Sequence, residues 1–396
     1  MKKLFRIISR TAVLLFTAFY LLAMRWWNRR RPRCRRVLIV APLRLGDFCM
    51  FLPTAAELTG YFRKRGLQIT LLVTPALEEM ARRSGADEIM LHPYPENAVS
   101  LTAAYRFYRQ LSGCRFQVAV AAVTERSFFH DDLPLLYSGA TELYLPRAVR
   151  LPERFWGVLP FWVDRFFFRD TIELPDYVLT PEMQNYGHLV QAVTGDFPAY
   201  RKPELPMAER PLFEGKYILF APGSQDISRC LDMETAHAVL SHLSLKYQVV
   251  IAGTAGEYER AEMLRRGNEK NCFNFCGKSD LPGLIRLISD ADAVVGVDSG
   301  IANLAILSGK NAIIALGQAN LRFMFVPPDA EKSGFQPPLV CRSKELCPYR
   351  NCNWNCPGYQ KGNTYQCMKI SAGEFIAVIE HGLENFRKPE NKRQED

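Results

Sequence analysis

Four short motifs in this sequence place a glycine beside an acid or a hydroxyl, directly after an apolar run. They are LRLGD at 43–47, APGS at 221–224, GTAGE at 253–257 and VDSG at 297–300. Glycine lets the backbone approach a ligand closely, and a helix that starts at such a loop presents N–H groups that bind phosphate. The first motif also supplies Asp47, a carboxylate that can act as a general base. Each motif alone is equally compatible with a tight turn or a helix cap.

The motifs come at the ends of predicted parallel strands. Runs such as VLIVA at 37–41 and YILFA at 217–221 are short and apolar, which is typical of strands buried on both faces. Strands alternate with helical patterns from 37 to 123, and the alternation restarts at 217. This βαβα order predicts an α/β protein with two doubly wound, Rossmann-like domains. Ligands bind at the carboxyl ends of the strands in such sheets, so the motifs are expected to line a cleft.

The excess of positive charge is confined to the N-terminus. The chain has a formal net charge of +9, but residues 1–36 hold eleven Lys or Arg and no acid. The rest of the chain has 39 basic and 41 acidic residues. A nucleic-acid-binding protein would spread basic residues over its folded face, so this class is excluded.

The N-terminal segment predicts membrane attachment. Residues 11–24 carry no charge, and seven Arg follow them by position 36. A helix of this length reaches about 21 Å, short of a hydrocarbon core of about 30 Å. The Arg cluster resists translocation and attracts anionic lipids, so we expect an anchor or embedded helix that contacts membrane lipids through residues 1–36. A cleaved signal peptide and a soluble helix are the alternatives.

Eleven cysteines are present, five of them close together near the C-terminus: Cys341, Cys347, Cys352, Cys356 and Cys367. Their spacing contains no C-x2-C pair, which is the usual sign of a zinc knuckle. The odd total argues against a simple disulfide framework. A loop with free thiols is favoured, and a metal site stays open.

The order of the motifs is specific where each motif is not. A strand with LGD, then PGS, then GTAGE, then CGKSDLPGLIRLISDADAVVGVDSGIANLA at 276–305, resembles glycosyltransferase family 9, the heptosyltransferases of lipopolysaccharide core synthesis. The resemblance covers roughly residues 36–375. Cys367-Met368-Lys369-Ile370 resembles the C-M-x-x-I ending of the family.

This resemblance implies a GT-B fold and an inverting, metal-independent transfer of heptose from a nucleotide-sugar, ADP-heptose, to a lipid-linked saccharide at the inner leaflet. No cofactor is implied, because the nucleotide-sugar is a substrate, and the protein is expected on the cytoplasmic side of the inner membrane. Four segments are expected: a membrane anchor at 1–35, an acceptor domain at 36–205, a nucleotide-sugar domain at 206–340, and a Cys-containing loop with a final helix at 341–396.

The resemblance also implies a role for each motif. Asp47 matches the aspartate of the family's LGD motif, the proposed base, and Glu257 matches an acid expected to bind the ribose hydroxyls. Backbone N–H groups at the start of helix 300–308 would hold the diphosphate. The expected donor-binding residues are Ser224, Arg229, Glu257, Asp298, Ser299, Gly300 and Asn303.

Three other clusters receive structural interpretations. Asp290-Ala291-Asp292 resembles a metal-binding D-x-D, but it ends a helix before a buried strand, and GT-B enzymes usually need no metal there. His130-Asp131-Asp132 lies in a predicted loop of the first domain, where contact with the acceptor is an option. The aromatic run Phe166–Phe168 is interpreted as core or as an acceptor-facing surface.

The donor half departs from the family pattern at three places. Arg229 stands near a position where the family commonly has Lys followed by an aromatic residue and Pro, Asn303 replaces a usual His, and Gly317-Gln318 replaces Gly-Pro. These changes bear on the donor sugar. Two alternatives therefore stay open: a family 9-like transferase that uses another nucleotide-sugar for a different surface glycan, and a non-catalytic, membrane-tethered sugar-nucleotide binding protein.

Overall fold

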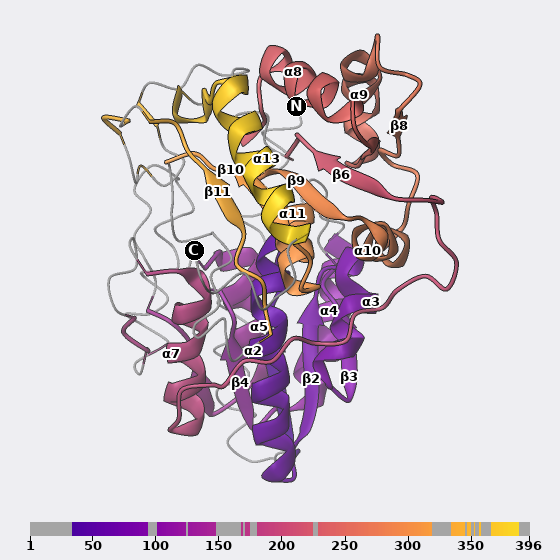
Figure 1. Ribbon diagram of the computed structural model, residues 1–396. Helices are drawn as coiled ribbons and strands as arrows, with labels where there is room; N and C mark the ends of the chain where they lie inside the picture. Colours follow the sequence, from indigo (N-terminus) through magenta and orange to yellow (C-terminus); the bar gives the residue numbers. More distant parts are fainter. Residues whose placement is uncertain are drawn as a thin grey trace, which may run out of the picture. The chain divides into compact units, whose positions relative to one another are not determined.

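The computed structural model describes two compact units of the chain (Figure 1). The described residues are 34–93, 101–123, 126–147, 168, 171–174, 180–224, 229–318, 334–344, 347–349, 352, 356–357 and 366–387. The first unit comprises Met1–Arg44, Thr54–Leu174 and Tyr186–Pro198, and the second comprises Leu45–Pro53, Pro175–Asn185 and Ala199–Asp396. The first turns of the helix after the first strand, Leu45–Pro53, therefore belong to the second unit.

The first unit is built on a five-stranded parallel sheet. Its strands are β1 (Arg36–Val40), β2 (Gln68–Val73), β3 (Glu88–Leu91), β4 (Val118–Ala121) and β5 (Glu142–Tyr144), in the order β3-β2-β1-β4-β5. All four strand pairs are parallel. Strand β4 is buried throughout, as expected for a strand that is covered on both faces.

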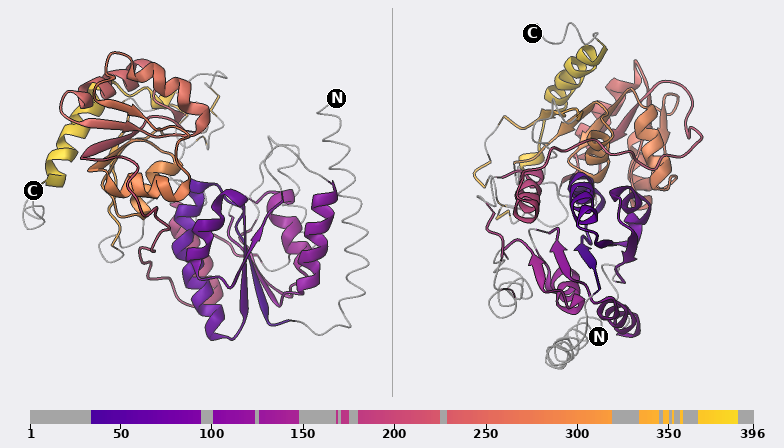
Figure 2. Two further views of the ribbon diagram at one scale, coloured as in Figure 1. Left: turned by 90° about the vertical axis from the view of Figure 1, so that its right-hand side faces the viewer. Right: turned by 90° about the horizontal axis from the view of Figure 1, so that it is seen from below.

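Helices cover both faces of this sheet, as the left view of Figure 2 shows. The elements are α2 (Leu45–Lys64), a mixed 3₁₀ and α segment with α3 (Glu78–Ala81), α4 (Leu101–Cys114) and α5 (Leu133–Ser138). Apolar side chains of α4 and α5 pack with Leu38 and Val40 of β1 and with Ala119 and Ala121 of β4. Helix α2 ends at Lys64, and Gly66 adopts a φ of 69°, which favours glycine.

The second unit has a six-stranded parallel sheet in the order β11-β10-β9-β6-β7-β8. The strands are β6 (Tyr217–Ala221), β7 (Gln248–Ile251), β8 (Cys272–Asn274), β9 (Ala293–Val297), β10 (Ala312–Ala315) and β11 (Leu339–Cys341). In order of sequence this is the 3-2-1-4-5-6 arrangement of a Rossmann fold, with the strand order reversing between β6 and β9. Ligands of such sheets bind beside that reversal, outside the carboxyl ends of the strands.

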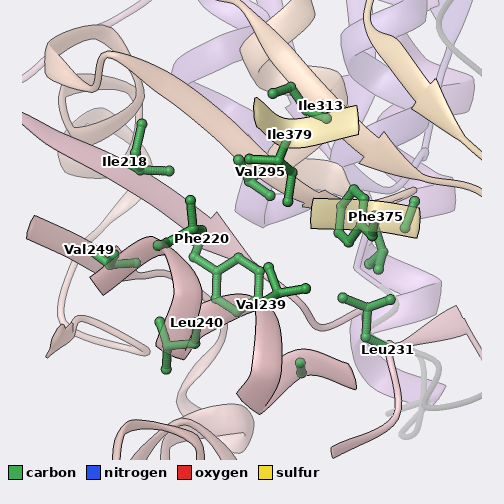
Figure 3. Packing of buried hydrophobic residues seen from close by; sticks show 14 of the residues in the cluster. Ile218, Phe220, Leu231, Val239, Leu240, Val249, Val295, Ile313, Phe375 and Ile379 are labelled. Carbon is green, nitrogen blue, oxygen red and sulfur yellow. The ribbon is translucent and has the colours of Figure 1, made fainter. Parts of the chain in front are cut away.

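The helices of the second unit are α7 (Glu182–Thr194, in part), α8 (Met233–Ser244), α9 (Tyr258–Arg265), α10 (Leu281–Asp290), α11 (Gly300–Leu307) and α13 (Ala372–Arg387). The C-terminal helix α13 packs against α8, β10 and β11 (Figure 1). Its Phe375 and Ile379 are fully buried, and they join Phe220, Val295 and Ile313 of the sheet in one core (Figure 3). Helix α13 thus completes the core of the second unit.

The predicted α/β class and the two doubly wound sheets are confirmed, and several details were wrong. Gly46 and Asp47 lie in the first turn of α2, not in a loop. The sequence NFCG at 274–277 predicts a strand, but the strand in this region is β8 at Cys272–Asn274. His130-Asp131-Asp132 lies in a π-helical turn, Phe128–Asp132, and not in a loop. Helix α4 and the short strands β5 and β11 were not predicted.

The predicted anchor at residues 1–35, with its hydrophobic helix, lies almost entirely outside the described residues. Within the described part of the chain, no helix combines the length and the apolar character needed to span a membrane. Phe166 and Phe167 also lie outside it, whereas Phe168 is buried in the core of the first unit, as one of the two interpretations expects.

Candidate functional site

The predicted base, Asp47, lies where the start of α2 meets the start of α11, within the second unit. Asn303 Nδ2 donates a hydrogen bond to the Gly46 carbonyl over 3.3 Å. A Cβ atom at residue 46 would lie 3.0 Å from that nitrogen and 3.4 Å from Gly300 Cα. A Cβ at residue 300 would lie 3.4 Å from the Leu45 side chain. The two glycines of the LGD and DSG motifs therefore allow two helix starts to pack closely together.

The start of α11 is capped by Ser299. This residue is extended, with φ −150° and ψ 169°, and its hydroxyl accepts a hydrogen bond from the Ala302 N–H over 3.4 Å. The hydroxyl satisfies one of the N–H groups that a helix start leaves open. The remaining N–H groups and the positive end of the helix dipole suit an anion.

Asp298 is a buried acid at the carboxyl end of β9. Its exposed fraction is 7%, and among the described residues its Oδ2 atom has no hydrogen-bond partner. Burial raises its pKa to about 6, and the positive charge of Arg229 opposes this shift. A buried carboxyl oxygen without a partner is costly, so a polar ligand group is the natural occupant of this position.

Glu257 lies above the loop after β6. Its Oε2 atom accepts hydrogen bonds from Thr254 N–H over 2.7 Å and from Thr254 Oγ1 over 2.8 Å, which completes a capping box. A Cβ atom at residue 223 would lie 1.9 Å from Glu257 Oε1. The glycine in APGS therefore lets the carboxylate of GTAGE lie directly against the loop after β6.

A small hollow of about 10 Å³, with room for about one water molecule and partly open to solvent, lies beside this carboxylate. Pro222, Gly223, Glu257, Arg260 and Cys276 are among its lining residues. Arg260 donates through Nη2 to the Leu231 carbonyl, and its buried Nε has no partner among the described residues. An acid and a guanidinium thus face the same pocket at the carboxyl ends of β6 and β7.

Ser224 and Arg229 flank residues 225–228, which lie outside the described residues. The backbone N–H of Ser224 donates to Cys230 Sγ over 3.2 Å, so the thiol ties the loop after β6 to the segment that carries Arg229. Burial raises the pKa of Cys230, which keeps it a thiol. Sequence reasoning missed this cysteine, because an isolated Cys between Arg and Leu carries no recognisable signal.

The structure gathers the predicted donor-binding residues near the strand reversal of the second sheet. Ser224 follows β6, Glu257 follows β7, and Asp298, Ser299 and Gly300 follow β9. Arg229 is close enough to Asp298 to affect its pKa. Asn303 is 6% exposed and contacts the LGD motif.

The other acidic and thiol clusters have structural surroundings. Asp290 ends α10 before β9, as predicted, and accepts a 2.7 Å hydrogen bond from Arg286 Nε. None of the eleven cysteines forms a disulfide. Within the described residues, no three Cys, His, Asp or Glu side chains are grouped so that they could hold a metal ion.

A buried polar cluster lies at the carboxyl end of β4 in the first unit. Arg126 donates through Nε to Asp132 over 2.9 Å and through Nη1 to the Pro146 carbonyl over 2.7 Å. The Asp131 carboxylate accepts a hydrogen bond from Ser127 N–H over 2.7 Å. Both side chains of the Arg126–Asp132 pair are 0% exposed. The π-helical turn that contains these acids is therefore held by buried charge pairing.

The raised pKa of Asp131 predicts that the stability of the protein depends on pH. Burial first, then the charge of Asp132, raises its pKa to about 7, against an unfolded value near 4. The folded chain therefore retains this proton up to higher pH than the unfolded chain, so the stability that Asp131 contributes is fully present below pH 4 and is lost as the pH rises to about 7. We expect the free energy of unfolding of Asp131→Asn to rise relative to that of wild type by about 2–4 kcal/mol as the pH increases across this window.

Urea denaturation of both proteins from pH 4 to pH 8 measures that gain. Asn keeps an oxygen that accepts from Ser127 N–H, so the change removes the titration and retains the contact. Asp298 titrates in the same window in both proteins and cancels in the difference. A constant difference between the two proteins from pH 4 to pH 8 would contradict the raised pKa.

Comparisons with known proteins give a family match over part of the chain and a fold. Residues 165–319 match the model of glycosyltransferase family 9 (heptosyltransferase). A search among curated proteins gives no match. Among solved structures, ADP-heptose lps heptosyltransferase II of E. coli is 16% identical with a TM-score of 0.62, and the alignment covers 89% of this chain and 100% of that one.

Two further structures are similar. A family 9 glycosyltransferase from Veillonella parvula is 15% identical with a TM-score of 0.67, covering 89% of this chain and 98% of that one. The E. coli heptosyltransferase WaaC with ADP is 16% identical with a TM-score of 0.57, covering 88% of this chain and 99% of that one. At these identities the likeness shows the fold, which is that of heptosyltransferases. The sequence match over residues 165–319 and this shared fold together confirm the resemblance of the chain to glycosyltransferase family 9 (heptosyltransferase).

Proposed function

We propose that this chain is an inverting, metal-independent glycosyltransferase that moves a heptose from ADP-heptose to a lipid-linked saccharide such as a lipopolysaccharide core. The family match supports the transfer of a sugar. One similar structure was solved with ADP, which supports a nucleotide-sugar donor. The sugar, the acceptor and the stereochemistry belong to the proposal.

One structural observation gives the main support for this proposed function. The helix start that holds Asp47 packs against the helix start at Gly300, through the Asn303–Gly46 hydrogen bond of 3.3 Å. A candidate base and a candidate diphosphate-binding helix start are therefore neighbours within one compact unit. Inverting transfer needs this combination, because the attacking hydroxyl and the leaving diphosphate lie on opposite sides of one carbon.

In the proposed reaction, the Asp47 carboxylate accepts the proton of an acceptor hydroxyl. The hydroxyl oxygen forms a bond to the anomeric carbon as the bond from that carbon to the diphosphate oxygen breaks. The electron pair of the broken bond leaves with the nucleoside diphosphate. General-base assistance of this kind contributes about 10²–10⁴-fold to a rate.

The leaving diphosphate would be held by N–H groups at the start of α11, beside Ser299 and Gly300, and by Arg229. A guanidinium can bind phosphate oxygens through two parallel hydrogen bonds. In the proposal, these positive groups take the charge-stabilising role that a metal ion has in other transferases. The Glu257 carboxylate would bind the ribose hydroxyls at the surface beside this hollow, and Asp298 and Ser224 would contact polar groups of the donor.

Membrane attachment through residues 1–36, on the cytoplasmic side of the inner membrane, is part of the proposal and rests on the sequence. An anchored enzyme meets a lipid-linked acceptor more often than a free one. The seven Arg at 25–36 would bind anionic lipid head groups, and each would contribute a favourable free energy of about 1 kcal/mol near the membrane surface.

A panel of ADP-, GDP- and UDP-sugars tests the proposal, scored by thermal stabilisation and by transfer to a lipid-linked acceptor, with and without EDTA. ADP-heptose is expected to stabilise the protein most, by mass action, and to be consumed equally in EDTA. Preference for another nucleotide-sugar overturns the heptose assignment. Binding without any transfer points to a non-catalytic sugar-nucleotide binding protein.

Gly223→Ala is expected to weaken ADP binding by about tenfold or more. The new methyl group would lie 1.9 Å from Glu257 Oε1, so the carboxylate must leave its position. Loss of a hydrogen bond to a charged group costs about 1.5–3 kcal/mol. Isothermal titration calorimetry with ADP measures the change. Gly60→Ala in α2 is the control, because no atom lies within 4 Å of its added Cβ, and equal affinities for the two variants would show that Glu257 does not contact the nucleotide.

A further inference from the structure

Asn303 occupies the position where the resembling family usually has His, and the sequence assigned it to the donor. In the structure it is 6% exposed, and its side-chain amide donates to the carbonyl of Gly46 over 3.3 Å. The two residues are 257 positions apart in sequence, and both belong to the second unit. The contact therefore joins α11 to the start of α2.

The surrounding packing makes this contact specific. The Gly46 position leaves only 3.0 Å between a Cβ atom and Asn303 Nδ2, and Leu45 approaches Gly300 closely from the same turn. A side chain at residue 46 would crowd the amide, whereas a Cβ at residue 300 would make ordinary contact with Leu45. The hydrogen bond between Asn303 and Gly46 therefore lies where the starts of α2 and α11 pack closely together.

The accepting carbonyl belongs to the peptide unit that leads into Asp47. Because a peptide unit is planar, holding the Gly46 oxygen fixes the orientation of the Asp47 N–H and restricts the position of its Cα. Asp47 lies in the first turn of α2, where fewer helical hydrogen bonds restrain the backbone. The Asn303 amide supplies a restraint at that point.

We infer that Asn303 is a positioning residue that holds the backbone beneath the base Asp47, and that it does not contact the donor. The inference rests on the proposed function for the identity of the base. It gives the Asn at this position a role of its own: a neutral amide holds the carbonyl without placing a cation beside the base.

The experiment compares Asn303→Asp, Asn303→His and wild type. Asp has the shape of Asn but cannot donate to the Gly46 carbonyl when ionised. We expect Asn303→Asp to lower kcat at least tenfold, with the donor KM and the ADP Kd within threefold of wild type. We expect Asn303→His to recover most of kcat, because a ring N–H can donate in place of the amide. Asn385→Asp, on the exposed face of α13, controls for an added charge.

Hydrogen exchange gives a second measurement that needs no catalysis. Amides of residues 45–52 should exchange at least tenfold faster in Asn303→Asp, while those of α13 are unchanged. If wild type transfers no sugar, the proposed function fails and this exchange still tests the positioning role. A tenfold rise in donor KM or ADP Kd, with unchanged exchange at residues 45–52, overturns the inference and returns Asn303 to the donor site.

Discussion

Replacing Asp47 with Asn is expected to lower kcat for sugar transfer by about 10²–10⁴-fold, with little change in ADP affinity. Asn has the size of Asp and cannot accept the proton of the acceptor hydroxyl. The side chain lies in the first turn of α2, next to the start of α11, so its loss affects proton removal and leaves the N–H groups that would hold the diphosphate in place. Steady-state kinetics with the preferred donor, together with ADP calorimetry, measure both quantities.

Glu57→Gln provides the matched control for Asp47→Asn. It removes a carboxylate from the same helix, ten residues later, in the part of α2 that belongs to the first unit. Its kcat should stay within about threefold of wild type, since surface charge removal rarely does more. If Asp47→Asn also retains kcat within threefold while it is folded, Asp47 is not the base, and another acceptor of the proton must be sought.

Replacing Arg126 with Met should destabilise the first unit by about 3–5 kcal/mol. The guanidinium and the Asp132 carboxylate are both 0% exposed, so removing one leaves a buried charge without its partner. Arg126 also holds the Pro146 carbonyl and lies 5.5 Å above the Phe168 ring. It thereby links β4, the π-helical turn and the segment around residue 146. Urea denaturation followed by hydrogen exchange of β4 measures the loss.

Arg147→Met is the control for this prediction, because Arg147 pairs with Glu173 at the surface and their side chains are 62% and 73% exposed. An exposed pair contributes at most about 1 kcal/mol. The double variant Arg126→Met with Asp132→Asn should regain part of the loss, since it removes the stranded charge. Equal destabilisation by Arg126→Met and Arg147→Met would show that the buried pair does not hold the first unit together.

Two departures from the family pattern are accounted for by contacts in the second unit. Asn303 holds the Gly46 carbonyl. Gln318 donates to the Ser343 carbonyl over 3.3 Å, accepts from Cys347 N–H over 3.0 Å, and its backbone N–H donates to the Cys367 thiol. Proline at 318 would lack that N–H and that side-chain amide. Gln318 thus ties the end of β10 to the cysteine-containing segment, which is a structural role and not evidence about the donor sugar.

The elements that sequence reasoning missed are those with short or irregular signals. In α4, Ala104, Phe107, Tyr108 and Leu111 are buried at spacings of three and four residues, so a helical period was there to be found. Strands β5 and β11 have three residues each, too few for a pattern. The π-helical turn at 128–132 depends on two hydrogen bonds, from Ser127 N–H to Asp131 and from Arg126 to Asp132. No local sequence pattern predicts these contacts.

The sequence by itself determined the two Rossmann-like sheets and the place of each motif after its strand. Buried parallel strands are continuous apolar runs, and glycine-containing loops follow them, so both signals are local. Only the tertiary structure decided which motifs meet. Gly223 lies against the Glu257 carboxylate, Gly46 lies beside Asn303, and the start of α2 belongs to the second unit rather than to the unit of its own strand. Such contacts join residues far apart in the chain, and they depend on how whole helices pack, which no window of sequence contains.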